Sequence, residues 1–166
     1  MVKVIFGLIL VVILSSIVFG SSVQSVYAIK TINDTSTGGD CQSSSIGTWN
    51  AATRTCTLSS DLSEGVVIGN NNIILDGNGH TIAGTSGNGI TVQYKTDITI
   101  KNITIKNFDT GIKIDNGIRV TLSTNTFSNN NYGISAANSN TITASGNTFS
   151  NNNYEIYVAN SNTITA

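Results

Sequence analysis

The most constraining feature of this chain is an internal repeat with a period of 22 residues. The stretch NTFSNNNY occurs at 125–132 and again at 147–154, and NSNTIT occurs at 138–143 and again at 160–165. A unit of this length cannot bury a hydrophobic core alone, so its copies must stack on one another as a solenoid. The period alone therefore predicts a solenoid of stacked repeats.

The hydrophobic pattern inside each repeat predicts strands. In rows of 22 residues starting at Ile90, apolar residues fall in the same columns, with mostly Thr, Ser, Lys and Asn between them. This alternation is typical of short strands with one buried face. A leucine-rich repeat has a similar length, but it requires Leu-rich columns and a helical segment, and the rows show neither. The sequence thus predicts an all-β fold, a parallel β-helix with three short strands in each coil of about 22 residues.

Two columns are expected to hold neighbouring coils together. Phe127 and Phe149 share an inward column, where each aromatic ring would stack on its copy in the next coil. Asn125 and Asn147 share another column, in which amide side chains can hydrogen-bond along the stack. Asn also tolerates the left-handed backbone of tight turns. These four residues are therefore predicted to be structural.

A glycine precedes each new row, at Gly89, Gly111 and Gly133. We expect these glycines to lie at a tight corner with positive φ, a conformation that glycine adopts without steric cost. Glu155 stands at the equivalent place in the last row and breaks this column.

The coil before residue 90 departs from the repeat. The distance from Ile73 to Ile90 is three residues longer than the corresponding distance in the next coil. Two Gly-rich segments, at 77–80 and 84–87, are expected to bulge outward and hold the extra residues.

The chain divides into three predicted segments. Residues 1–28 combine Lys3, an apolar run and VYA ending at Ala28, which predicts a secretory signal peptide. An uncleaved membrane anchor is the alternative. Residues 29–65 would form an N-terminal cap, and residues 66–166 the coils. After cleavage the protein would be secreted, periplasmic or on the cell surface, without membrane contact.

The charge of the chain limits its expected partners, and its cysteines predict a disulfide. Without Lys3, seven Lys and Arg residues stand against nine Asp and Glu residues, so the mature chain carries −2. It has no basic patch, so nucleic acid is not an expected partner. In an exported chain the two cysteines, Cys41 and Cys56, are expected to form a disulfide that staples the cap.

The chain ends at Ala166, directly after a predicted strand. We expect it to be a fragment with further coils missing, because an open coil end exposes apolar surface and unpaired strand edges. End-to-end stacking of a homo-oligomer is the alternative, and the sequence leaves the oligomeric state open.

The segment LDGNGHTIAG, followed by GITV, ITIKNITIKNFDTGI and NTFSNNNYGI, resembles the repeats of NosD-like and pectate-lyase-like proteins. The resemblance covers about residues 66–166 and implies a right-handed parallel β-helix. Because the same fold carries lyases, hydrolases, epimerases and non-catalytic surface proteins, it implies little about activity.

The resemblance to NosD would imply an accessory role in maturation of a copper enzyme. Copper prefers His, Cys and Met ligands. His80 is the only His of the chain, and the mature segment has no Met, so His80 alone is left as a metal candidate. We expect no cofactor, with Ca²⁺ as the alternative if the protein is a polysaccharide lyase.

The pectate-lyase resemblance implies polysaccharide chemistry, with acidic residues that hold Ca²⁺ and an Arg or Lys base in the lyases. Asp97 lies one repeat below Arg119, and Lys113 and Asp115 share one strand. Asp97, Arg119 and Asp115 are the catalytic candidates, and a surface ion pair is the alternative interpretation. The motifs NTD and GHG of galacturonases are absent from the sequence.

We therefore expect an exported or cell-surface β-helix repeat protein without catalytic activity, serving surface display or contact with a polysaccharide or cell-surface glycan. A polysaccharide-acting enzyme is the alternative. Two sequons, at Asn33 and Asn102, are glycan acceptors only in a host that glycosylates exported proteins.

Overall fold

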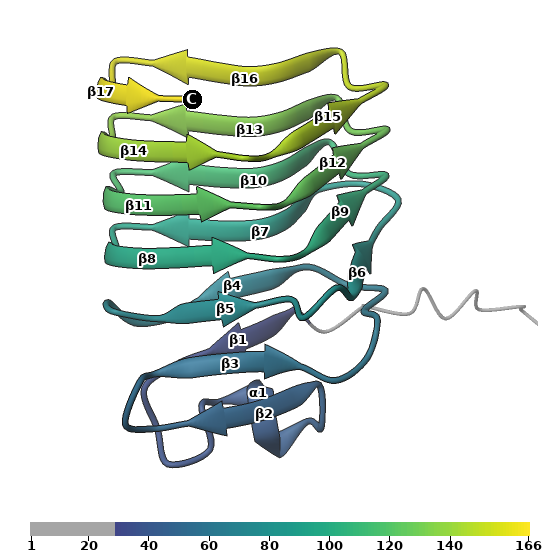
Figure 1. Ribbon diagram of the computed structural model, residues 1–166, viewed down its shortest axis with the longest axis vertical. Coiled ribbons are helices and arrows are strands. Elements are labelled where there is room, and N and C mark those ends of the chain that lie inside the picture. Colours follow the sequence, from purple (N-terminus) through teal and green to yellow (C-terminus); the bar gives the residue numbers. More distant parts are fainter. Residues whose placement is uncertain (1–28) are drawn as a thin grey trace, which may run out of the picture.

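The protein is a three-sided column of stacked coils. The computed structural model describes residues 29–166, and Figure 1 shows the coils rising from the N-terminal end to the C-terminal end. The predicted signal peptide, residues 1–28, lies outside the described residues. Within residues 29–166, every element apart from one short helix, α1 (Asp40–Ser43), is a strand, so the predicted all-β parallel coil architecture is confirmed.

Three sheets form the three sides of the column. The first sheet, in spatial order, comprises β1 (Lys30–Ile32), β4 (Val66–Ile68), β7 (Asn88–Gln93), β10 (Thr110–Asp115), β13 (Tyr132–Ala137) and β16 (Tyr154–Ala159). The second comprises β2 (Gly47–Asn50), β3 (Thr55–Leu58), β5 (Ile74–Asp76), β8 (Thr96–Lys101), β11 (Ile118–Ser123), β14 (Asn140–Ser145) and β17 (Asn162–Thr165). The third comprises β6 (Thr81–Ala83), β9 (Thr104–Lys106), β12 (Thr126–Ser128) and β15 (Thr148–Ser150).

The strand register reproduces the sequence period. Ile112 of β10 pairs with Ile90 of β7 on one side and with Ile134 of β13 on the other. Alternate residues of each strand point inward, and below the last coil the inward Ile, Val and Leu side chains are almost fully buried, whereas Val158 of β16 is 40% exposed. Short strands that could not bury a face alone therefore share one continuous core.

The two predicted stacking columns are present. The rings of Phe127 and Phe149 stack with their centroids 5.1 Å apart and an interplanar angle of 12°. The backbone N–H of Asn125 donates to Oδ1 of Asn147 at 2.9 Å, and Nδ2 of Asn125 donates to the carbonyl of Ile100 at 2.9 Å. The side chain of each ladder Asn thus satisfies backbone groups of the coil below it, which an apolar side chain could not do.

The prediction that glycines 89, 111 and 133 have positive φ is wrong. The glycines with positive φ lie elsewhere, and these three lie inside strands of the first sheet. A Cβ at Gly111 would stand 2.5 Å from the carbonyl oxygen of Gly133 in the next coil. Close approach between coils, rather than turn conformation, therefore demands glycine there.

Asparagine is the most frequent residue at the left-handed positions. They recur from coil to coil at the corners, and the asparagines among them are Asn72, Asn78, Asn102, Asn107, Asn116, Asn129, Asn138, Asn151 and Asn160. The expectation that Asn serves the turns is confirmed, although the ladder residues Asn125 and Asn147 are not among them.

The N-terminal region closes one end of the column. Cys41 of α1 and Cys56 of β3 form the predicted disulfide, and both are buried. β2 runs antiparallel to β3, whereas β3 pairs in parallel with β5. Parallel coil structure therefore begins before residue 66, inside the segment predicted as a cap. Within residues 29–166, no helix has the length and apolar character needed to cross a membrane.

The aromatic column predicts a sharp contrast between neighbouring residues. Phe127 is 0% exposed, so Phe127→Ala should lower the free energy of unfolding by about 3–5 kcal/mol through lost burial and a cavity. Ser128→Ala, one residue on and facing outward, should change it by less than about 0.5 kcal/mol. Chemical denaturation followed by circular dichroism measures both, and equal effects would contradict the inward stacking.

The glycine column predicts a second contrast. Gly111→Ala should cost about 1–3 kcal/mol, because the new methyl group forces neighbouring coils apart. Gly111→Asn should be at least as damaging for the same steric reason. If the position instead required a left-handed backbone, Asn would be tolerated better than Ala, and thermal unfolding of the two variants decides between these explanations.

Candidate functional site

Two extra residues create a bulge at one corner of the first complete coil. Asp76 pairs with Lys101, and Thr81 pairs with Thr104. The connection from β5 to β6 is therefore two residues longer than the connection from β8 to β9 in the next coil. The extra residues fall in the segment 77–80, where the sequence predicted a bulge. They displace this corner from the otherwise regular stack.

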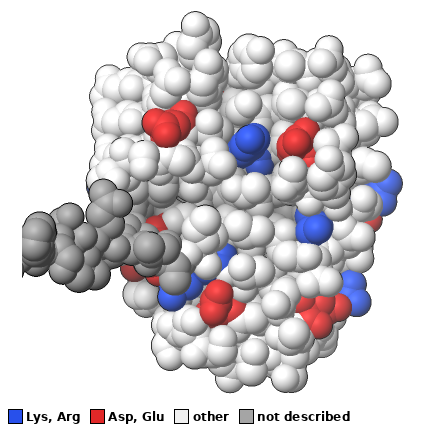
Figure 2. Space-filling model, turned by 180° about the vertical axis from the view of Figure 1, so that it is seen from behind, with Lys and Arg blue, Asp and Glu red and all other residues white. Residues whose placement is uncertain are grey.

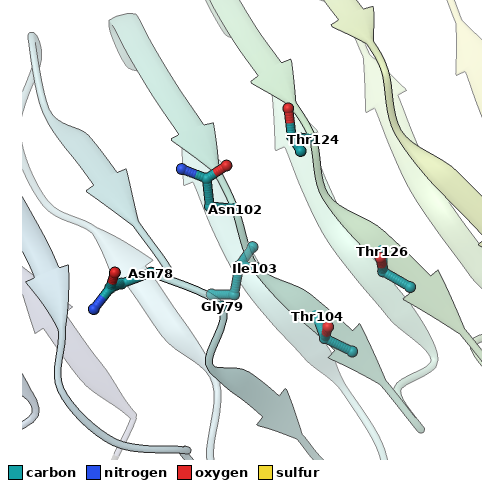
Figure 3. Close-up of a pocket in the computed structure, with 7 residues that line it drawn as sticks. All are labelled: Asn78, Gly79, Asn102, Ile103, Thr104, Thr124 and Thr126. Atoms are coloured by element: carbon teal, nitrogen blue, oxygen red, sulfur yellow. The ribbon is translucent and has the colours of Figure 1, made fainter.

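A shallow groove lies above the bulge, at the corner between the second and third sheets. Its volume is about 410 Å³, and we call it the Thr groove. Figure 3 shows its lining residues, which are Asn78, Gly79, Asn102, Ile103, Thr104, Thr124 and Thr126. All of these side chains are uncharged, so the groove offers hydroxyl and amide groups and no ion-pairing group.

Asp76 fixes the wall of the Thr groove. Its Oδ1 accepts hydrogen bonds from the backbone N–H of Asn78 at 2.9 Å and from Nδ2 of Asn102 at 3.2 Å. Its Oδ2 lies 3.1 Å from Nζ of Lys101. The backbone N–H of Gly79 donates to the carbonyl of Asn102 at 2.9 Å. The bulge is therefore tied to the coil above it through both main chain and side chain.

These contacts change the acidity of Asp76. Partial burial alone would raise the pKa of this carboxyl, but the hydrogen bonds from Asn78, Lys101 and Asn102 outweigh it and hold the pKa below its ordinary value. Asp76 is thus a carboxylate at neutral pH, and its role at this site is to position Asn78 and Asn102.

A second groove lies at the corner between the third and first sheets. One extra residue separates β6 from β7, since Ala83 pairs with Lys106 and Asn88 pairs with Thr110. The groove has a volume of about 690 Å³, and we call it the Asn groove. Its lining residues are Gly84, Thr85, Asn107, Phe108, Asp109, Asn129, Asn130, Asn131, Asn151 and Asn153.

The catalytic candidates are only partly brought together. Nε and Nη2 of Arg119 donate to the two carboxylate oxygens of Asp97 at 2.6 and 2.7 Å. Asp115 instead accepts hydrogen bonds from Nδ2 of Asn116 at 3.0 Å and of Asn138 at 3.3 Å. The two-pronged bond and the charge of Asp97 raise the pKa of Arg119 further above its ordinary value. A base needs a lowered pKa, so this pair is suited to an ion pair on the surface rather than to proton abstraction.

His80 also has an ordinary structural partner. Its Nδ1 lies 3.2 Å from Oδ1 of Asp61, which also accepts the backbone N–H of Thr81 at 2.9 Å. Within the described residues 29–166, no three His, Cys, Asp or Glu side chains gather in a way that could hold a metal ion.

Charge is dispersed over the surface. Figure 2 shows Lys and Arg interspersed with Asp and Glu on a mostly uncharged face. This face therefore carries no extended field of one sign that would steer a highly charged polymer toward it.

The stacked coils, the inward columns and the Asn ladder define a β-solenoid repeat protein. The family model for the right-handed beta helix region matches residues 43–166, and the chain belongs to this family. No curated protein and no solved structure matches the chain.

The sequence interpretation missed the two grooves as sites, although it located their cause. The prediction that extra residues bulge near 77–80 and 84–87 is confirmed by the strand register. The catalytic candidate residues predicted from the sequence are charged, whereas the grooves are lined mainly by Asn and Thr. The residues stacked one coil above those bulges line both grooves. The bulge positions are therefore the sequence signal that could have located the grooves.

The acidity of Asp76 predicts a pH dependence of stability. Because its pKa is lower in the folded chain than in the unfolded chain, its carboxylate stabilises the fold above the unfolded pKa, and this contribution is lost as the pH falls through the folded pKa. Asp76→Asn should therefore lose less stability than the wild type between about pH 5 and about pH 2. Thermal unfolding across this range measures the difference, and parallel curves for the two proteins would contradict it.

Proposed function

We propose that this is an exported or cell-surface β-helix repeat protein that contacts glycans without transforming them. The observation that carries the proposal is the position of the two grooves. Both form where the extra residues at 77–80 and 84–87 interrupt the 22-residue repeat, and both are lined mainly by uncharged side chains. A chain that needed only to stack would gain nothing from these extra residues.

The chemistry of the Thr groove suits sugar hydroxyls. Thr104 and Thr126 pair as neighbours on β9 and β12, so their side chains follow one another along the axis of the column. A hydroxyl can both donate and accept a hydrogen bond, and the amide of Asn102 does the same with two separate groups. An extended glycan lying along the column could therefore meet similar partners from one coil to the next.

The disulfide supports export. Disulfides persist in oxidising compartments and are rare in the cytosol, and the bond between Cys41 and Cys56 joins the cap to the first coil. The predicted signal peptide and this bond point to the same compartment.

Enzymatic action on polysaccharides is the competing function. It would rest on Asp97 and Arg119, which lie side by side on neighbouring coils. Their mutual hydrogen bonds occupy the carboxylate and raise the pKa of the guanidinium, so neither group is poised for acid–base chemistry. The geometry therefore favours glycan contact over catalysis.

The test is binding and turnover on one panel of neutral and acidic polysaccharides. We expect binding without release of unsaturated products or new reducing ends. The double variant Thr104→Val and Thr126→Val removes two hydroxyls at nearly constant shape and should weaken binding by about three- to tenfold for each hydroxyl engaged. Thr121→Val, which alters a residue of β11 outside the groove, should bind like the wild type.

Two results would overturn the proposal. One is the absence of binding to every polysaccharide of the panel. The other is turnover that Arg119→Ala abolishes, which would establish the enzyme instead.

A further inference from the structure

Three tyrosines form an exposed aromatic cluster on the first sheet. The rings of Tyr132 on β13 and Tyr154 on β16 stack with their centroids 4.9 Å apart and an interplanar angle of 12°. Tyr157 meets Tyr132 edge-on, at 5.5 Å and 62°. Tyr154 is 54% exposed and Tyr157 is 46% exposed. We call these three residues the tyrosine cluster.

Stacking of the coils does not demand Tyr157, the third member of this cluster. The copies at 125–143 and 147–165 differ at three positions, and at one of them Ser135 is replaced by Tyr157. Ser135 and Tyr157 pair in register and occupy the same outward position. Since serine serves that position one coil below, the ring of Tyr157 is an addition to the surface that the fold does not need.

The tyrosine cluster borders the Asn groove. Tyr132 and Tyr154 directly follow Asn131 and Asn153, which line that groove. The backbone N–H of Tyr132 donates to the carbonyl of Asp109, a further lining residue, at 2.9 Å. The strands that carry Tyr132 and Tyr154 therefore begin at the corner where the Asn groove lies.

The electrostatics of the Asn groove favour an uncharged ligand. The carboxylate of Asp109 accepts the backbone N–H of Gly87 at 2.6 Å and so already has a partner. The other lining residues of the groove are neutral, and neither Lys nor Arg is among them. An acidic sugar would find no cation in this groove to pair with its carboxylate.

We infer that the tyrosine cluster and the Asn groove form one binding site for a neutral sugar unit of a glycan. The C–H face of a pyranose ring packs against tyrosine rings, whose amphipathic character suits a ligand with apolar and hydroxylated faces. The ring hydroxyls bind the amides of Asn131 and Asn153, which can donate and accept. This inference rests on the proposed function and adds to it the site and the class of sugar.

The experiment compares the wild type with single variants by calorimetric titration, using oligosaccharides of glucose, mannose and galactose, with polygalacturonate as the acidic comparison. Tyr154→Ala and Tyr157→Ala should each weaken binding of the neutral ligand by about tenfold. Tyr157→Phe keeps the ring and should retain binding. Tyr94→Ala is the matched control, because Tyr94 is 67% exposed at another corner of the column.

The outcomes separate this inference from the proposed function. Binding of polygalacturonate alone, or neutral binding that survives both alanine variants, overturns the inference and leaves glycan contact standing. Absence of all binding overturns both. A dimer seen by sedimentation in the wild type and lost in Tyr154→Ala and Tyr157→Ala would show that the cluster serves self-association, and would overturn the inference as well.

Discussion

The parallel hydrogen-bond ladder between equivalent positions of successive coils is the constraint on which the rest of the structure depends. It places Ile90, Ile112 and Ile134 in one line, so that each residue packs on its equivalent in the preceding coil. Once this register is set, the choice of side chain follows from its place in the coil. Inward positions must be apolar, strand positions that meet a carbonyl of the next coil must be glycine, and buried corners must supply amide groups for the backbone.

The two grooves form where this constraint is relaxed. A perfect stack has nearly flat sides, since each coil covers the one below it. Added residues at 77–80 and 84–87, in the coil formed by β4, β5 and β6, break the alignment at two corners and leave a groove above each. Because the core columns are unaffected there, such changes alter the surface while the inward packing keeps its register.

The fold could be predicted in detail because it depends on a periodic pattern that is visible in one sequence. The coil length, the inward phenylalanines, the Asn ladder and the disulfide all follow from spacing or pairing. The glycine conformation could not be predicted, because positive φ and close approach both select glycine at Gly111, and only the neighbouring carbonyl distinguishes them. The pairing of Asp97 with Arg119 followed from register, whereas the separate partners of Asp115 depend on how the corner turns. The grooves depend on the same corner geometry.

The hydrogen bonds of the Asn ladder also bear on how a chain like this can change its length. Asn125 bonds to Asn147 in the coil above and to the carbonyl of Ile100 in the coil below, so each link refers only to adjacent coils. Duplication of one whole unit in frame reproduces every such link, whereas loss of part of a unit breaks several together. The segments 125–143 and 147–165, which differ at three positions, have the form that such a duplication would leave. The column can therefore lengthen or shorten in evolution by whole coils. The length of each coil and the residues that bond to its neighbours stay constant.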